Sequence, residues 1–406
     1  MKFLSFKYLI PMALLIASLA GCGGGGGSPA GSTAISGTAS AGIIYPGVVN
    51  VYAVNSNGVK GTLLKSTATD INGKYTLSLG DYSGAILVEV SGTYTDEATG
   101  NTVTIPTTNP LHALVDSVNS STSNNRVVSV TPLTDLAWRK ASSNGTSATP
   151  PAVIATANNL MDDLFKISDI IGIEPVRPDI ASVGHSSTSQ ESQAYTLALA
   201  ALSKMASTAT GTTDYDKMNT ILSRIETEIE TDGAMSTTAA EFSAALGTAL
   251  LSSDSTTRAA DDFPSAATQL AAVGKKSQLL TLSITGTLPA GTKIHAIEGA
   301  ITLPATVSLR AESTGKTLSD VLLLAGVATG MGSEPIANYL SLQVPKEVDF
   351  NVVLNTGIGT GDFAVLSYDV STGATVTAAD FSLVSGTVFV KDSNGADIPG
   401  LTLTIR

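Results

Sequence analysis

The sequence contains a single cysteine, Cys22, in 406 residues. One cysteine excludes any disulfide within the chain. Histidine is also scarce: His112, His185 and His295 lie far apart, and none belongs to the pair of histidines four residues apart that binds zinc in many hydrolases. We therefore expect no cofactor and no histidine-based metal centre.

Basic residues are few as well. Lys and Arg number 22 against 34 Asp and Glu, which gives a formal net charge of −12, and charged residues make up only 14% of the chain. Nucleic-acid binding needs clustered cations that contact phosphates, and docking on anionic lipid needs a polybasic surface. The composition therefore excludes nucleic acid as a partner and argues against electrostatic attachment to a membrane.

The apolar run at the start of the chain is too short to span a membrane. It covers residues 8–20, which is 13 residues, whereas a spanning helix needs roughly 20. Lys2 and Lys7 precede this run and small residues follow it, which is the order of a secretory signal peptide. We assign residues 1–21 to such a signal, and the loss of its two lysines takes the formal charge from −12 to −14.

The run ends in LAGC at residues 19–22, which resembles the bacterial lipobox. The resemblance implies cleavage before Cys22 and a diacylglycerol on its sulfur, so that Cys22 anchors the protein in a membrane. The alternative is an ordinary signal peptide with a free thiol left over. Several acyl chains give stable anchoring where one does not.

Residues 22–33 then comprise the lipidated cysteine and a Gly-rich tether. The 11 flexible residues after Cys22 have a root-mean-square span of roughly 18 Å. In bacterial lipoproteins an Asp after the cysteine retains the protein in the inner membrane, so Gly23 implies the outer membrane. The folded body would face either the periplasm or the exterior.

Residues 34–108 have the strand spacing of an antiparallel sandwich. Segments rich in Val, Ile, Thr and Tyr alternate with turn clusters such as DING at 70–73, where Gly73 supplies a positive φ. With ISG at 35–37 and PGVVNV at 46–51, this stretch resembles the carboxypeptidase-regulatory, transthyretin-like domain. The resemblance implies a non-catalytic β-sandwich that acts as a spacer or binding module.

The period changes to that of helices over residues 109–276. Two sets of apolar residues fall on single helical faces: Met218, Ile221, Leu222, Ile225 and Ile229, and Tyr195, Leu199, Leu202 and Ala206. Because the faces are well separated along the chain, they predict several distinct helices. We expect about five, packed as an irregular bundle.

Helix ends are marked by capping residues. Thr131 suits an N-cap and Pro132 the first helical position. The other end signals are two capping-box pairs and a terminal glycine: Thr188 with Glu191, Thr238 with Glu241, and Gly233 closing the helix that Thr213 opens.

Residues 277–406 return to strand spacing, with about nine segments, which fits a larger β-sandwich. The segment GDFAVLSYDV at 361–370, the step AADF at 378–381 and the hairpin DSNG at 392–395 resemble the cohesin and carbohydrate-binding-module group of sandwiches. The resemblance implies a binding module. The predicted fold class is therefore multidomain: a β-sandwich, then an irregular α-helical bundle, then a larger β-sandwich.

Three short motifs approach catalytic signatures and depart from them. GHSST at 184–188 begins like a nucleophile elbow, but Thr188 replaces the required glycine. STGK at 313–316 has serine–lysine spacing but lies in an expected β turn. GTLPAGTK at 286–293 has Thr292 where a phosphate loop has lysine. We therefore predict that the chain is not an enzyme.

The closing hairpin holds the metal-ligand candidates Asp392, Asn394 and Asp397. Calcium takes 6–8 oxygen ligands, and this loop offers about three. A hairpin turn selected for its backbone conformation explains the same residues. We therefore predict no specific metal site there.

Sugar binding by the last sandwich would need exposed aromatic side chains. Tyr339, Tyr368 and Phe389 are the candidates, while Trp138 lies on an expected helix and is assigned to the core. Exposed aromatics in one plane would favour glycan binding. Two carboxyls facing each other about 5 to 9.5 Å apart in a cleft would favour a glycosidase.

The sequence thus favours a non-enzymatic outer-membrane lipoprotein that presents binding or scaffold modules in the cell envelope or at the cell surface. Its partner would be an unidentified protein or glycan. The first alternative is glycan binding by residues 277–406, and the second is a hydrolase with a site built only from carboxylates.

Overall fold

The structure is a computed structural model. It describes residues 33–55, 59–119, 125–143, 151–176, 188–312, 314–332, 335–370 and 374–406. Cys22, the signal segment and His185 lie outside the described residues. Ser313 of the STGK motif also lies outside them.

In the described residues, eight strands precede the first helix. They are β1 (Thr33–Thr38), β2 (Gly47–Val54), β3 (Lys60–Ala68), β4 (Lys74–Gly80), β5 (Gly84–Thr95), β6 (Thr102–Ile105), β7 (Leu111–Val118) and β8 (Asn125–Val127). One sheet has the order β3-β2-β5-β6 with β7 also on β5, and the other has the order β4-β1-β8. All of these pairs are antiparallel except β1 with β8. Burial alternates along β2 and β4, because successive side chains of a strand point to opposite faces and only one face is turned toward the core.

The first sheets extend further along the chain than the sequence suggested. The boundary was placed after residue 108, but β7 pairs with β5 and β8 pairs with β1 beyond that point. A strand that passes into a helix was expected around Val127, where β8 lies, but β7 was missed. The buried β7 reads as a continuous apolar run, which periodicity does not separate from a helix.

Seven α-helices follow in the described residues. They are α1 (Pro132–Ser142), α2 (Pro151–Phe165), α3 (Gln190–Ser207), α4 (Asp214–Asp232), α5 (Thr237–Leu246), α6 (Ala259–Asp262) and α7 (Pro264–Leu270). The predicted faces of α3 and α4 are all buried. Two of the seven, α6 and α7, are too short to give a periodic signal, which explains why the sequence predicted about five.

Several helix ends are those that the sequence predicted. Thr131 caps α1 with Pro132 at its first turn, and Thr213 forms a capping box at the start of α4. Gly233, with φ of 67°, ends α4. Such a positive φ suits glycine because it has no Cβ.

Two predicted capping boxes are wrong. Ser189, and not Thr188, caps α3. At α5 the Thr238 hydroxyl donates to the Glu228 carboxylate at 2.6 Å, and the same carboxylate accepts the Ser236 amide at 2.8 Å. A carboxylate from α4 therefore takes the place of the local cap.

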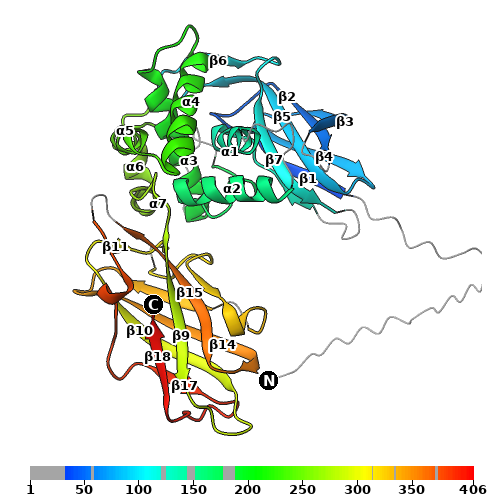
Figure 1. The fold of residues 1–406 in the computed structure, drawn as a ribbon. Coiled ribbons are helices and arrows are strands. Elements are labelled where there is room, and N and C mark those ends of the chain that lie inside the picture. The colour runs from blue at the N-terminus through cyan, green and yellow to red at the C-terminus, as the bar shows by residue number, and fades with distance from the viewer. Residues whose placement is uncertain are drawn as a thin grey trace, which may run out of the picture.

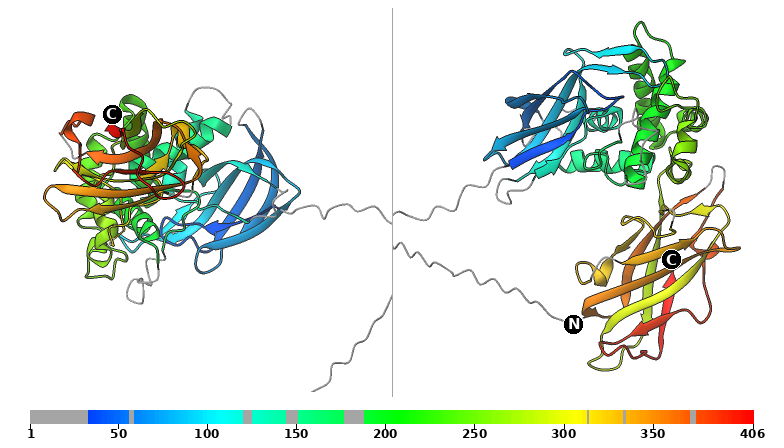
Figure 2. Two further views of the ribbon diagram at one scale, coloured as in Figure 1. Left: turned by 90° about the horizontal axis from the view of Figure 1, so that it is seen from below. Right: turned by 180° about the vertical axis from the view of Figure 1, so that it is seen from behind.

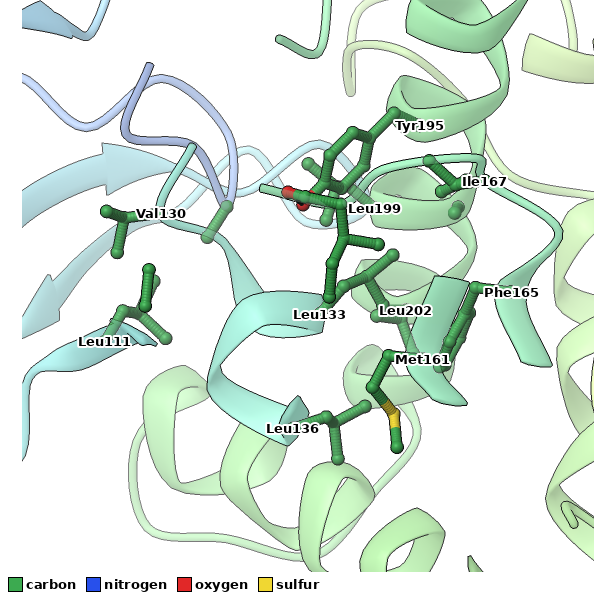
Figure 3. Close-up of a cluster of buried hydrophobic side chains, with 14 of the residues drawn as sticks. Leu111, Val130, Leu133, Leu136, Met161, Phe165, Ile167, Tyr195, Leu199 and Leu202 are labelled. Atoms are coloured by element: carbon green, nitrogen blue, oxygen red, sulfur yellow. Dashed lines mark hydrogen bonds between the residues drawn. The ribbon is translucent and has the colours of Figure 1, made fainter. Parts of the chain in front are cut away.

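One buried cluster spans the first sheets and the helices. It runs from Ile35 in β1 to Val273 after α7. Figure 3 shows part of it, where Leu111 and Val130 of the strand region approach Leu133 of α1 and Leu202 of α3. The sheets and the helices therefore share one apolar core, although the sequence placed a domain boundary between them.

After Lys276, the described residues form ten strands and two 3-10 helices. The strands are β9 (Gln278–Gly286), β10 (Ile294–Leu303), β11 (Val307–Ser308), β12 (Leu322–Leu324), β13 (Ile336–Leu340), β14 (Lys346–Ile358), β15 (Gly361–Val370), β16 (Ser382–Leu383), β17 (Phe389–Lys391) and β18 (Leu401–Ile405), and the 3-10 helices are Gly326–Ala328 and Ala378–Asp380. Two five-stranded sheets, β13-β14-β10-β16 with β17 and β11-β15-β9-β18 with β12, enclose a second buried cluster. This cluster shares no residue with the first.

The predicted fold class is confirmed: antiparallel sandwiches flank a central helical region. Figure 1 shows the helices beside the first sheets and the last sandwich below α7, and the views in Figure 2 agree. In the part of the chain that the structure describes, no helix has the length and apolarity needed to cross a membrane.

Candidate functional site

The closing hairpin at 392–397 is a turn in which the Asp392 carboxylate accepts hydrogen bonds from backbone amides of the turn. Its Oδ1 accepts the amides of Asn394 at 2.8 Å and Ala396 at 2.9 Å. These two backbone hydrogen bonds lower the pKa of Asp392. Gly395 has φ of 78°, and the Asp397 carboxylate lies 3.3 Å from the Lys391 ammonium. The DING turn repeats this geometry, with Asp70 accepting from Asn72 and Lys74.

We expect millimolar calcium to leave the melting temperature of the whole protein unchanged. The Asp392 and Asp397 carboxylates already have partners in the turn, and too few other oxygens lie in the loop to complete a calcium shell. Thermal unfolding in chelator and in calcium measures this, with Asp392→Ala as the control variant. A calcium-dependent rise that disappears in that variant would contradict the prediction, because ligand binding to the folded state stabilises it.

The three aromatic candidates for sugar binding do not share a face. Tyr339 and Tyr368 are 8% and 4% exposed and point into the sandwich, and only Phe389 is substantially exposed at 39%. The Tyr368 hydroxyl donates to Gln278 inside the fold. Alternation along each strand therefore turned two of the three rings inward.

Histidine and tryptophan meet in a cluster that the sequence did not predict. The Nδ1 atom of His112 on β7 is hydrogen-bonded to one carboxylate oxygen of Asp135 on α1 at 2.7 Å. The Arg139 Nε donates to the other Asp135 oxygen at 2.8 Å. The imidazole stacks on the Trp138 ring with a centroid distance of 3.5 Å and an interplanar angle of 12°. Its Nε2 faces Glu89 at 3.9 Å.

This cluster joins β7 to α1 and leaves the imidazole little access to a substrate. Both ring nitrogens face carboxylates and one ring face is covered by indole, while His112 is only 6% exposed. The Thr134 hydroxyl also donates to the His112 carbonyl at 2.8 Å. We assign the cluster to packing of the helix on the sheet.

Trp138 is the sole tryptophan, so fluorescence reports directly on this cluster. We expect His112→Asn to increase the tryptophan emission, because the stacked imidazole, which quenches an excited indole in contact with it, is removed. The asparagine amide keeps a donor near Asp135. His295→Asn, in the other sandwich, is the matched control, and equal emission from both variants would contradict the stacking.

A second cluster lies where the helical region meets the last sandwich. The Lys166 side chain is fully buried, and its ammonium contacts Asp369 of β15 at 2.7 Å, Asp163 of α2 at 3.2 Å and the Ser277 hydroxyl at 3.1 Å. It also donates to the Lys275 carbonyl at 2.6 Å. Lys166 therefore joins the two separately packed bodies through charge-assisted hydrogen bonds.

The backbone at Lys166 is strained. Its φ of 58° is the only positive value at a non-glycine position among the described residues, and such a conformation costs on the order of 1–3 kcal/mol. Burial alone would raise the pKa of Asp163, but Lys166 and Ser277 hold it below its usual value. The strained backbone conformation of Lys166 therefore lies at the residue whose ammonium enters the joint.

A second ion pair, within the last sandwich, lies close to this joint. Arg310 of the sandwich contacts Asp320 at 2.5 Å, and Asp162 of α2 lies near both. Burial raises the pKa of Asp162 to about 7, the Ile170 amide opposes that rise, and the charges of Asp169 and Asp320 add to it. Charged side chains of α2 and of the sandwich therefore lie close together at the joint.

A cleft of about 640 Å³ opens beside this joint. One wall comes from α7 with residues 271–273 and 275, and the other from residues 308–312, 314 and 315 with the hairpin residues 339–343 and 346. Its carboxylates are Glu312 and Asp369, and Asp369 is held by Lys166 and Ser277. The pair of available carboxyls that a glycosidase would need is therefore not assembled here.

The near-catalytic motifs of the sequence lie in turns. Gly286 and Gly291 have φ of 118° and 78° between β9 and β10, and Gly315 has φ of 89°. These glycines are explained by backbone conformation. The GHSST motif has only Thr188 among the described residues.

Comparison with known proteins gives one weak likeness. No protein-family model matches the chain, and no curated protein matches it. Among solved structures, a cohesin module from the family 33 glycoside hydrolase of Clostridium perfringens ATCC13124 is similar at 10% sequence identity and a TM-score of 0.17. The match covers 31% of this chain and 95% of that module. A likeness at this score adds no weight to any assignment of function.

Proposed function

We propose that this chain is a non-enzymatic lipoprotein of the bacterial outer membrane that presents β-sandwich modules for binding or scaffolding. The observation that carries the proposal is the Lys166 joint. It links two separately packed bodies through a fully buried ammonium and carboxylates from both sides. Such a link uses the charged groups for holding modules together, which suits a presenting scaffold.

The clusters of charged side chains support a structural role over a catalytic one. His112 and Asp135 hold a helix on a sheet, and Lys166 and Asp369 hold the helical region on the sandwich. The first sandwich would act as a spacer or binding module, consistent with its resemblance to carboxypeptidase-regulatory domains. The membrane anchor is Cys22, as the residues LAGC at 19–22 indicate.

Replacing Cys22 with serine is expected to move the protein from the outer-membrane fraction to the soluble fraction. Serine offers no sulfur for the thioether, and the chain's negative charge gives no other attachment to lipid. Fractionation and labelling with a radioactive fatty acid measure this in cells that express the full chain. Circular dichroism of the released protein should be that of a folded body.

Gly23→Asp is the matched variant for the sorting part of the proposal. It should keep the lipid label but shift the protein to the inner membrane. If the Cys22→Ser protein still sediments with the outer membrane, or takes up no less fatty acid than the unaltered chain, the anchor is not Cys22.

A further inference from the structure

The cleft at the joint has the position and size of a ligand site. Its volume of about 640 Å³ lies within the usual range for small-molecule pockets, which occur preferentially between domains. Its two walls belong to the two separate buried clusters, because Val273 after α7 is part of the first and Leu309 is part of the second. A molecule bound here would touch both bodies.

Three cations line this cleft in a chain whose net charge is −12, namely Lys275, Arg310 and Lys346, against Glu312 and Asp369. Arg310 is paired with Asp320, and Asp369 is paired with Lys166 behind the wall. The charges of the lining that have no ion-pair partner among the described residues are therefore those of Lys275, Lys346 and Glu312. In a recess, one excess charge attracts an oppositely charged ligand more strongly than on an open surface, because the low-dielectric walls focus the field.

Lys275 is the cation best placed to meet a ligand. It lines the cleft and is half-buried, and no ion pair between described residues includes its ammonium. Arg310 is 8% exposed and is held by Asp320, whereas the Lys346 ammonium donates to two backbone carbonyls. An anionic group would therefore find its first partner at Lys275.

Both walls also carry hydroxyl groups. Ser265 and Thr268 stand on the α7 wall, and Ser308 and Ser341 on the sandwich wall. A hydroxyl both donates and accepts hydrogen bonds. Such walls match a ligand whose own groups are hydroxyls better than one with acceptors alone.

An apolar side chain stands at the mouth of the same cleft. Leu342, at the tip of the hairpin between β13 and β14, lines the cleft and is 97% exposed. An exposed leucine in this position offers a surface to the C–H face of a ring. The cleft thus combines a cation, hydroxyls on two sides and one apolar edge.

We infer that this cleft binds an acidic saccharide. The ring hydroxyls of a uronic acid meet the serine and threonine hydroxyls of the two walls, and its carboxylate meets Lys275. The inference goes beyond the proposed presenting role, because it names a ligand class and a site that the anchor does not involve.

The test is isothermal titration of the full body with trimers of galacturonic acid and of glucuronic acid. The same trimers as methyl esters keep the ring hydroxyls and lose the charge. We expect at least one acid trimer to bind about tenfold more tightly than its ester, since a hydrogen bond to a charged group contributes that much. Lys275→Gln should abolish this difference.

Lys276→Gln is the matched control. Lys276 is the next residue and is exposed, but it does not line the cleft. It should bind the acid trimer as the unaltered protein does. A two-site variant, Ser308→Ala with Ser341→Ala, tests the hydroxyls and should weaken the acid and the ester alike.

Several results would overturn the inference. No binding of either acid trimer at about 10 mM, equal binding of acid and ester, or equal loss in Lys275→Gln and Lys276→Gln would each exclude it. Full displacement of the trimer by the same concentration of acetate would reduce the site to an anion site without sugar recognition. None of these results bears on Cys22 fractionation, so the two proposals fail separately.

Discussion

Lys166→Met is expected to lower the free energy of unfolding by about 3–5 kcal/mol, because removing one partner of a buried ion pair leaves the other charge uncompensated. Asp369 is 5% exposed and would lose its ammonium partner at 2.7 Å. Chemical denaturation followed by circular dichroism measures the loss. The joint should also loosen, which small-angle scattering would detect as an increased radius of gyration.

Two further variants separate the ion pair from general effects of substitution. Lys276→Met changes an exposed lysine close in the chain and should shift stability by no more than about 0.5 kcal/mol. Lys166→Met combined with Asp369→Leu removes both buried charges and should recover part of the loss. An unfolding free energy for Lys166→Met equal to that of Lys276→Met would show that the joint does not depend on the ammonium.

Glu97→Gln is expected to stabilise the protein at pH 8 by about 1–2 kcal/mol and to change little at pH 4. Glu97 is 5% exposed, and its Oε2 has no hydrogen-bond partner among the described residues. Burial raises the pKa of Glu97 well above its ordinary value, while its own backbone amide opposes that rise and Asp96 adds to it.

The sign of this pH dependence follows from proton binding. The unfolded carboxyl ionises near its ordinary pKa, but the folded one keeps its proton to higher pH. The folded state thus binds more protons between the two values, and stability is lost as the pH rises through the raised pKa. Glutamine carries no titratable proton, so the loss should be absent from the variant.

Thermal unfolding from pH 4 to pH 8 measures this difference. Glu230→Gln is the control, because Glu230 on α4 is exposed and should shift stability little at any pH. If the two variants give parallel curves of melting temperature against pH, the orphaned Glu97 oxygen does not carry the effect.

Local signals in the sequence predicted many of the strands, though not β7, and several helix ends. Thr131 with Pro132 starts α1, and Thr213 with Gly233 bounds α4, because each signal acts within one turn of its own helix. The Asp392 turn was predicted for the same reason. These features depend on the residues next to them and on little else.

Features that depend on distant residues were not predicted. The Thr238 cap failed because a carboxylate from α4, ten residues earlier, takes its place. His112 and Asp135 come from a strand and a helix, and Lys166 and Asp369 come from two bodies. The inward turn of Tyr339 and Tyr368 needed the register of each strand, which the sequence left open.

The sharing of one apolar cluster by the first sheets and the helices has a consequence for recombination. A gene fragment that ended near residue 108 would encode strands whose buried faces lack α1 and α3, and its product would expose them to water. A fragment starting after Lys276 would carry a whole buried cluster with it. The last sandwich is thus the part that a chain could gain or exchange as a unit. After such an exchange the buried Lys166 ammonium would lose Asp369, and the new domain would have to supply a carboxylate in its place.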